Sequence, residues 1–193
     1  MRTLGVIPAR GGSKRVHRKN IRQVWGRPLI AWTIEAAKHS NLTDWIVSTE
    51  DAEIEQIALS YGAHVLKRPD YLAWDSVSSI AVCKHALDAM EIDAEPYDIV
   101  VLLHPTSPIR SPKHIDEAVA LLAQSNAPSL ASVSCRKRTY SHNASIYALK
   151  VPLPDNHYSD ESIPYLMDRY HSLDIDEEVD LKTAEVYLQC LAQ

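Results

Sequence analysis

The alternation of short apolar runs with helical patterns between residues 3 and 134 constrains the fold more than any other feature of this sequence. Short continuous apolar runs are typical of buried parallel strands, and apolar residues spaced three and four apart are typical of helices that pack on a sheet. The predicted strands cover residues 3–8, 45–48, 64–66, 99–103 and 129–134. The predicted helices cover residues 28–38, 52–61, 78–90, 112–124 and 180–191. This order predicts an α/β fold with a doubly wound, mostly parallel sheet.

The length of 193 residues is that of one ordinary domain, which can bury a core without disulfides or metals. We therefore expect residues 1–193 to form a single domain, in which residues 135–162 are the least regular stretch. Hydrophobic residues make up 46% of the chain. No apolar run approaches the ~20 residues that a bilayer span needs. These features favour a globular protein that does not cross a membrane.

Charge and cysteine content exclude several classes of partner. The formal net charge of −5 gives no general attraction for nucleic acid or anionic membranes, so a polyanion would need a local cluster of cations. The three cysteines are an odd number and lack the CxxC spacing of a zinc site. We expect a protein of the reducing cytoplasm, without a disulfide framework.

The segment after the first predicted strand carries such a cluster of cations. Residues 9–20 contain the turn Gly-Gly-Ser and five cations, namely Arg10, Lys14, Arg15, Arg18 and Lys19. Backbone N–H groups of a glycine-rich turn can approach phosphate oxygens closely, and Arg and Lys neutralise phosphate charge. The loop therefore predicts a site for a phosphate-bearing ligand, although it is neither a Walker A loop nor a GxGxxG fingerprint. The alternative is a solvated basic loop.

Two acidic residues near the carboxyl end of the chain suit a metal ion. Asp174 and Asp176 lie one residue apart in a polar turn, where they can share a hard cation that also binds phosphate oxygens. The alternative is that they belong to an acidic helix start, because Glu177 and Glu178 follow them and negative charge there favours the helix dipole.

The Pro-Thr-Ser-Pro turn at residues 105–108 follows the clearest predicted strand. Ligands of parallel sheets lie beyond the carboxyl ends of the strands, so Thr106, Ser107 and Arg110 are candidates for contacts with sugar hydroxyls or a carboxylate. The alternative is a helix start in which Ser111 is the cap, and both interpretations can hold together.

Six segments form a recognisable series: residues 7–20 (IPARGGSKR, then RKN), 47–51 (VSTED), 68–79 (RP, LA and DSVSS), 103–110 (LHPTSPIR), 143–147 (NASIY) and 172–176 (SLDID). In their order and spacing they resemble the motifs of the acylneuraminate cytidylyltransferases. These are the CMP-sialic acid synthetases and their relatives that act on pseudaminic and legionaminic acids. The resemblance covers most of the chain and implies a Rossmann-like fold of the nucleotide-diphospho-sugar transferase type.

The resemblance also implies roles for the residues at matching positions. The nucleotide-binding set, which holds the triphosphate and recognises cytidine, comprises Ala9, Arg10, Gly12, Ser13, Lys14, Asn20, Arg68 and Ser79. The catalytic set, which lies at the reacting phosphate and the metal, comprises Arg10, Lys14, Lys19, Asp174 and Asp176. The acceptor-sugar set comprises His104, Thr106, Ser107 and Tyr147. The implied cofactor is Mg²⁺ on Asp174 and Asp176. Tyr147 also fits an ordinary core position.

The chain departs from the family pattern at three places. His104 replaces a Gln that contacts the acceptor, and Ala144-Ser145 replaces a pattern that contains glycine. Judged by family spacing, about thirty residues are missing between Ser134 and Asn143. In the relatives that segment builds the dimer and completes the neighbouring acceptor site, and only the basic residues 136–138 remain here. We therefore expect a monomer or a weak homodimer.

The predicted reaction converts CTP and an acidic nine-carbon sugar into a CMP-sugar and pyrophosphate. The anomeric hydroxyl would attack the α-phosphorus in line, while Arg10 and Lys14 stabilise the departing pyrophosphate. Two alternatives stay open. The chain is a CTP-binding homologue that has lost catalysis with its acceptor segment, or it is a sugar nucleotidyltransferase with a different sugar or base.

Overall fold

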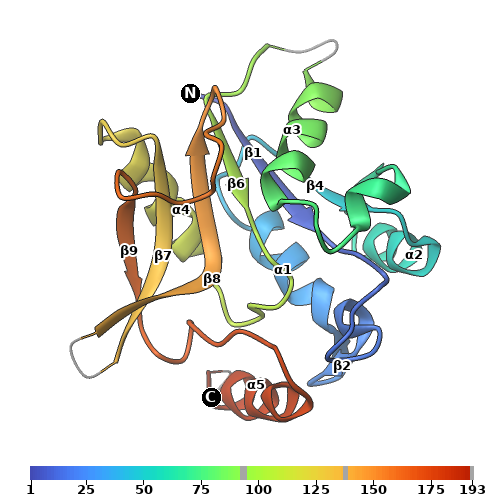
Figure 1. Cartoon of the computed structure of the whole chain (residues 1–193). Helices are drawn as coiled ribbons and strands as arrows, with labels where there is room; N and C mark the ends of the chain where they lie inside the picture. The colour runs from blue at the N-terminus through green and yellow to red at the C-terminus, as the bar shows by residue number, and fades with distance from the viewer. Residues whose placement is uncertain (92–94, 137–138, 192–193) are drawn as a thin grey trace.

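A computed structural model describes residues 1–91, 95–136 and 139–191, and its centre is a seven-stranded sheet with helices on both faces (Figure 1). The strand order is β5-β4-β1-β6-β8-β7-β9. The strands are β1 (Thr3–Pro8), β4 (Asp44–Thr49), β5 (His64–Lys67), β6 (Ile99–Leu102), β7 (Ser129–Arg136), β8 (Thr139–Lys150) and β9 (Ile163–Met167). A separate small hairpin joins β2 (Gln23–Val24) to β3 (Arg27–Pro28).

Most strand pairs in the sheet are parallel. Strand β1 pairs with β4 and β6, β4 pairs with β5, and β7 pairs with β9, all in parallel. Strand β8 lies between β6 and β7 and is antiparallel to both. The predicted α/β fold with a mostly parallel, doubly wound sheet is therefore confirmed, with an antiparallel strand inserted beside β6.

The helices that pack on the sheet cover both of its faces, because each of them presents an apolar stripe to it. Helices α1 (Leu29–Lys38), α2 (Ala52–Ser60) and α4 (Pro112–Ala123) share one core cluster, and α3 (Ser79–Met90) packs in a second cluster with β1 and β6. Helix α5 (Glu178–Leu191) packs against the β2–β3 hairpin (Figure 1). Short 3₁₀ turns lie at Lys19–Ile21 and Asp70–Ala73. Within the described ranges, every helix is too short or too polar for a bilayer span.

Residues 135–162 differ from the sequence-based expectation. We expected an irregular stretch, but Thr139–Lys150 is a long strand, and Ile163–Met167 adds an edge strand that the sequence did not predict. The first residues of β8 are polar and exposed, and only its second half carries the apolar run that marks a buried strand. The remaining basic residues expected here, Lys137 and Arg138, lie outside the described residues.

A bulge separates the two halves of β8. The register with β7 shifts between Ala131 and Val133, so several residues of β8 oppose Ser132. The Ser132 hydroxyl donates to Asn143 Oδ1 at 2.5 Å and accepts from the Ile146 N–H at 2.8 Å. Ala144 has φ 56°, a left-handed conformation that favours glycine. The alanine that replaces a glycine of the family pattern therefore occupies a strained backbone position.

Candidate functional site

A pocket of about 570 Å³ lies at the carboxyl ends of β1, β5 and β6, where the loops after these strands converge. The predicted site residues that line it are Arg10, Ser13, Lys14, Lys19, Asn20, Arg68, Ser79, His104, Thr106 and Asp176. Those outside its lining are Ala9, Gly12, Ser107, Tyr147 and Asp174. The structure thus brings together residues that lie far apart in the chain.

The cations of loop 9–20 that face this pocket are paired with acids of the same chain. Arg10 Nη1 lies 2.5 Å from Asp75 Oδ1, and Lys14 Nζ forms an ion pair with the other oxygen of Asp75. Lys14 first and Arg10 second hold the pKa of the Asp75 carboxyl below its usual value. Asp75 lies beside Trp74, which lines the same pocket and is 65% exposed. The loop is therefore not simply solvated, and a phosphate ligand must compete with Asp75.

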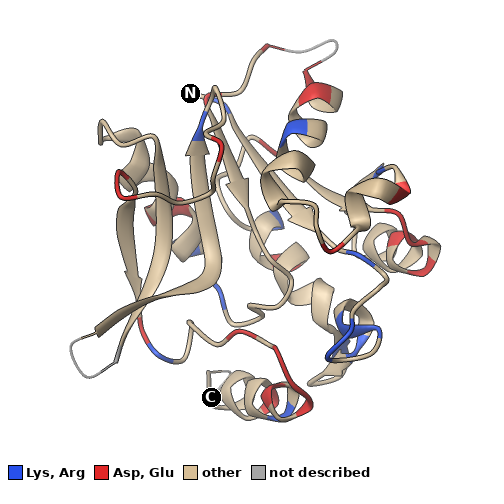
Figure 2. Cartoon of the chain, in the orientation of Figure 1, with Lys and Arg blue, Asp and Glu red and all other residues tan. Residues whose placement is uncertain are grey.

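Two further cations of the loop that line the pocket, Arg15 and Lys19, also pair with an acid of the same chain. Arg15 Nη1 lies 2.7 Å from Asp176 Oδ1, and Lys19 Nζ lies 3.8 Å from the same atom. Lys19 Nζ also donates to the carbonyl of Ile175 at 2.5 Å. Figure 2 shows blue Lys and Arg positions gathered near the β2 hairpin, close to red positions that precede α5. The need for an anionic partner that the sequence indicates is thus met partly inside the chain.

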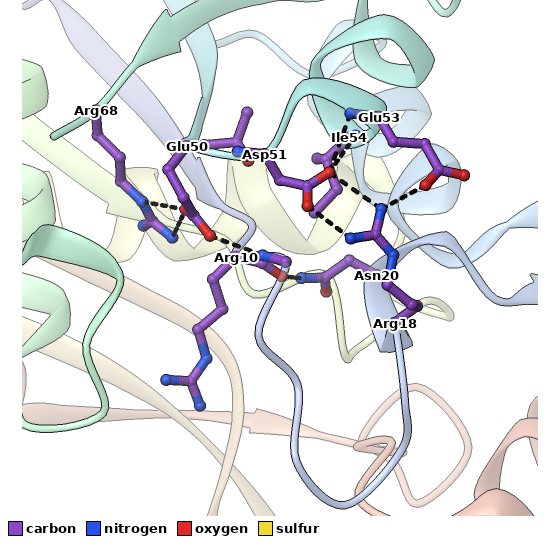
Figure 3. Close-up of polar contacts among 10 residues, drawn as sticks. Arg10, Arg18, Asn20, Glu50, Asp51, Glu53, Ile54 and Arg68 are labelled. Atoms are coloured by element: carbon purple, nitrogen blue, oxygen red, sulfur yellow. Dashed lines mark hydrogen bonds and ion pairs between the residues drawn. The ribbon is translucent and has the colours of Figure 1, made fainter. Parts of the chain in front are cut away.

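Arg18 points away from the pocket and fixes the end of the loop. Its guanidinium donates to both carboxylate oxygens of Asp51, at 2.6 and 3.1 Å, and to Glu53 (Figure 3). Asp51 also caps α2 by accepting from the N–H groups of Glu53 and Ile54. The hydrogen bond from Arg18 is the largest cause of the lowered pKa of Asp51. This cation therefore has a structural role.

A second acidic residue at the end of β4 contacts the pocket residues themselves. Glu50 Oε2 accepts from Arg68 Nε at 3.0 Å and from Arg68 Nη2 at 2.9 Å, while Glu50 Oε1 accepts from the Gly11 N–H at 2.8 Å (Figure 3). Asn20 Nδ2 donates to the Arg10 carbonyl at 2.9 Å and ties the two ends of the loop together. Our sequence interpretation gave Glu50 no role, although it stands in the VSTED segment directly after a buried strand.

Asp174 and Asp176 occupy different environments in the loop before α5. Asp174 is largely buried, which raises the pKa of its carboxyl; a hydrogen bond from Thr106 opposes this shift. Within the described residues, Asp174 Oδ1 is buried without a hydrogen-bond partner. Asp176 lines the pocket. Directly before α5, Asp180 Oδ2 accepts from the N–H groups of Asp176 and Glu177 at 2.9 and 2.8 Å, which fixes the backbone beside Asp176.

The carboxylates of Asp174 and Asp176 suit a hard cation, although two side chains alone do not complete its coordination. Among the described residues, no group of three or more His, Cys, Asp or Glu side chains is arranged to hold a metal. Magnesium in nucleotide sites is commonly bound by one or two carboxylates together with substrate phosphates. The orphaned oxygen of Asp174 and the neighbouring carboxylate of Asp176 fit that donor set.

Of the four acceptor residues, His104 and Thr106 line the pocket, and Ser107 and Tyr147 lie outside its lining. His104 lines the pocket, and its burial, followed by the nearby charges of Arg110 and His157, lowers its pKa to about 4. The Tyr147 ring lies 6.0 Å from the His104 ring and is 4% exposed, so Tyr147 packs in the core behind His104. Burial raises the pKa of Tyr147 to about 12.

The buried Arg110 supports the Pro-Thr-Ser-Pro turn by donating to the carbonyl of His104, the residue before it. Arg110 donates to Thr33 Oγ1 at 2.9 Å and to the Ser145 carbonyl, and it does not line the pocket. The expectation that Arg110 contacts a ligand is therefore wrong for this structure, because its guanidinium is used inside the fold. Ser107 is also buried, and only Thr106 of the two hydroxyl residues in the turn reaches the pocket.

The fold and the pocket define an α/β protein with a pocket lined by several cations at the carboxyl edge of its sheet. A solved CMP:2-keto-3-deoxy-manno-octonic acid synthetase complexed with CTP shares this fold, with a TM-score of 0.76 and 16% identity over all of both chains. The model of the cytidylyltransferase family matches residues 4–190, and the chain belongs to this family.

Two relatives with named activities are similar to this chain in sequence. An N-acylneuraminate cytidylyltransferase of Escherichia coli O18:K1:H7 is 35% identical over 221 aligned residues, which cover 95% of this chain and 52% of that protein. A CMP-N,N'-diacetyllegionaminic acid synthase of Legionella pneumophila is 44% identical over 63% of this chain and 53% of its own. The chain thus spans about half the length of these relatives. Because 221 aligned positions exceed the 193 residues of this chain, the first relative also has residues within the matched region that this chain lacks.

Proposed function

We propose that this chain is a cytidylyltransferase that activates a nonulosonic, sialic-acid-like sugar, converting CTP and the acidic nine-carbon sugar into CMP-sugar and pyrophosphate. One observation carries the proposal: Arg10, Lys14 and Lys19 face the same pocket as Arg68 and Asp176. Cations for a triphosphate, an arginine suited to a base and a carboxylate suited to a metal are the groups that nucleotidyl transfer requires. Membership of the family and the names of the relatives support the same reaction.

In the proposed reaction the anomeric hydroxyl of the sugar forms a bond to the α-phosphorus as the bond to the pyrophosphate oxygen breaks, and the hydroxyl proton passes to solvent water. Arg10 and Lys14 leave Asp75 to bind the departing phosphates. Lys19, which is held at the Ile175 carbonyl, lies at the side of the pocket near Asp176 and binds the α-phosphate. Their fixed positive charge stabilises the charge that develops on the phosphate oxygens.

Asp174 and Asp176 would hold the Mg²⁺ that the reaction requires. A bound Mg²⁺ neutralises phosphate charge and lowers the pKa of a hydroxyl that it coordinates. The two aspartates belong to a loop fixed at Ile175, whose N–H donates to the Thr106 carbonyl at 2.8 Å. Asn143 Nδ2 donates to Ser172 Oγ at 2.9 Å and holds the same loop to β8.

Incubation with CTP, Mg²⁺ and a panel of nonulosonic acids, followed by mass spectrometry and pyrophosphate release, tests the proposal. Asp176→Asn should lower turnover about a hundredfold or more. Glu177→Gln, which changes the neighbouring acid, is the matched control and should retain turnover. An Asp176→Asn protein as active as the wild type would remove this residue from the mechanism. CTP binding without pyrophosphate release would instead support a homologue that has lost catalysis.

We also propose that the chain is a monomer or a weak homodimer, because the segment to which the family resemblance assigns assembly is short here. A stable dimer buries about 1,200–2,000 Å² in total, more than we expect the short segment from Cys135 to His142 to supply. Light scattering at micromolar concentration measures this directly. A tight dimer would contradict the proposal.

A further inference from the structure

Glu50 joins two parts of the candidate site without lining the pocket. Its carboxylate engages the Arg68 guanidinium through one oxygen and the Gly11 N–H through the other. Gly11 belongs to the phosphate loop, and Arg68 follows β5 and lines the pocket. One side chain from the end of β4 therefore connects the loop after β1 to the residue after β5, as Figure 3 shows.

The ion pair between Glu50 and Arg68 is buried, so its geometry is tightly constrained. The side chains of Arg68 and Glu50 are only 3% and 16% exposed. A buried guanidinium needs a charged partner, and two hydrogen bonds along one edge fix its plane as well as its position. Because Glu50 takes Nε and Nη2, it leaves Nη1 of Arg68 for a ligand in the pocket.

Asp51, the residue that follows Glu50, confines the phosphate loop at Gly11 from the other side. A Cβ atom on Gly11 would overlap the carboxylate of Asp51, which is itself fixed by Arg18 and by the start of α2. The backbone of Gly11 is therefore held between Glu50 and Asp51. The entry of the phosphate loop has little freedom to move relative to Arg68.

We propose that Glu50 is a positioning residue of the nucleotide site. It orients Arg68 toward the base and fixes the phosphate loop at Gly11, and it acts through these groups without contact to the ligand. The inference rests on the proposed function, because it assigns the base to Arg68. The two tasks use different oxygens, so they can be separated by substitution.

Glu50→Gln separates them because its amide oxygen can still accept from the Gly11 N–H, while its amide group cannot accept from Arg68. We expect CTP affinity to fall about tenfold or more, and affinity for inorganic pyrophosphate, the phosphate-only probe, to stay unchanged. Glu50→Ala removes both acceptors and should weaken both ligands. Glu53→Gln, which changes an acid of the same segment that contacts only Arg18 in this network, is the control and should change neither affinity.

A double-mutant cycle with Arg68→Gln completes the experiment, with affinities from calorimetry and folding from thermal melting. If Glu50 acts through Arg68, Glu50→Gln should cost no further CTP affinity once Arg68 is changed. Additive losses, or equal losses of CTP and pyrophosphate in Glu50→Gln, would overturn the inference. Should Glu50→Gln fail to fold, Glu50→Asp keeps the charge but withdraws the carboxylate by one methylene, and its loss of CTP affinity should also vanish once Arg68 is changed. A wild-type chain that binds pyrophosphate but not CTP would overturn the proposed function as well.

Discussion

The two sides of the sheet meet at β6 and contribute to the site in different ways. On one side β1, β4 and β5 are parallel to β6, and the loops at their carboxyl ends carry the pocket cations and Arg68. On the other side β8 is antiparallel to its neighbours, and it reaches the site through the hydrogen bond from Asn143 to Ser172. The parallel strands bring their carboxyl ends to this edge, whereas the antiparallel β8 brings its amino-terminal half there.

This difference has a consequence for substitutions. Changes in the loops of the parallel side should alter ligand binding with little effect on folding. Changes in β8 should alter stability, because its inward side chains pack in the same core as those of β1. The following predictions test this division, from the largest expected effect to the smallest.

Ile146→Ala in β8 and Ile7→Ala in β1 should each lower the free energy of unfolding by about 2–5 kcal/mol. Both side chains are fully buried in one core cluster, so removing either leaves a cavity in the same core. Chemical denaturation should show a single transition for both variants. Leu59→Ala, at a residue that is 54% exposed, is the control. A separate early transition in Ile146→Ala alone would mean that the two sides unfold independently.

His104→Gln should reduce the loss of the free energy of unfolding that the wild type shows at acid pH. The folded-state pKa of His104 is about 4 and its ordinary value is 6.5, so the unfolded chain binds the proton more strongly. Stability is therefore lost as pH falls from 6.5 toward 4, and this difference in pKa corresponds to a loss of about 3 kcal/mol. Denaturation at pH 7 and at pH 4.5 measures the difference. Equal pH dependence in the variant and the wild type would contradict a neutral, buried His104.

Arg10→Ala should weaken pyrophosphate and CTP binding by about 1.5–3 kcal/mol, because a charged hydrogen-bond donor to phosphate is lost. The melting temperature should change little, since Lys14 still pairs with Asp75. Arg22→Ala removes a nearby cation that pairs with Glu178 and should leave affinity unchanged in calorimetry. Full affinity in Arg10→Ala would place the phosphates elsewhere.

Ala144→Gly should stabilise the fold by about 1 kcal/mol, because glycine adopts a left-handed backbone without the penalty of a Cβ atom. Ala148→Gly is the matched change in the same strand, at a buried position away from the bulge, and it should destabilise. Thermal melting of the two variants should therefore show changes of opposite sign. A loss of stability in Ala144→Gly would show that the bulge carries no such strain.

The sequence predicted the parallel side well because each of its central strands is buried on both faces and its helices have clear apolar stripes. It did not predict β8, whose polar first half is specified by pairing with β7 and not by any local pattern. The motif residues Arg10, Lys14 and Arg68, which the sequence assigned to one nucleotide site, line one pocket, and their roles in binding stay predictions. The acids that pair with them were not predicted as partners, because Asp75 lies 65 residues from Arg10 and only the fold brings them together.

If the pocket binds a polyphosphate as proposed, the pairing of its cations with internal carboxylates makes that binding an exchange of one set of anions for another. Asp75 occupies Arg10 and Lys14, and Asp176 occupies Arg15 and Lys19. A polyphosphate that binds these cations replaces one set of anions with another, so the net change in paired charge at the pocket is small. The carboxylates that it displaces become free to bind a cation that arrives with the phosphates.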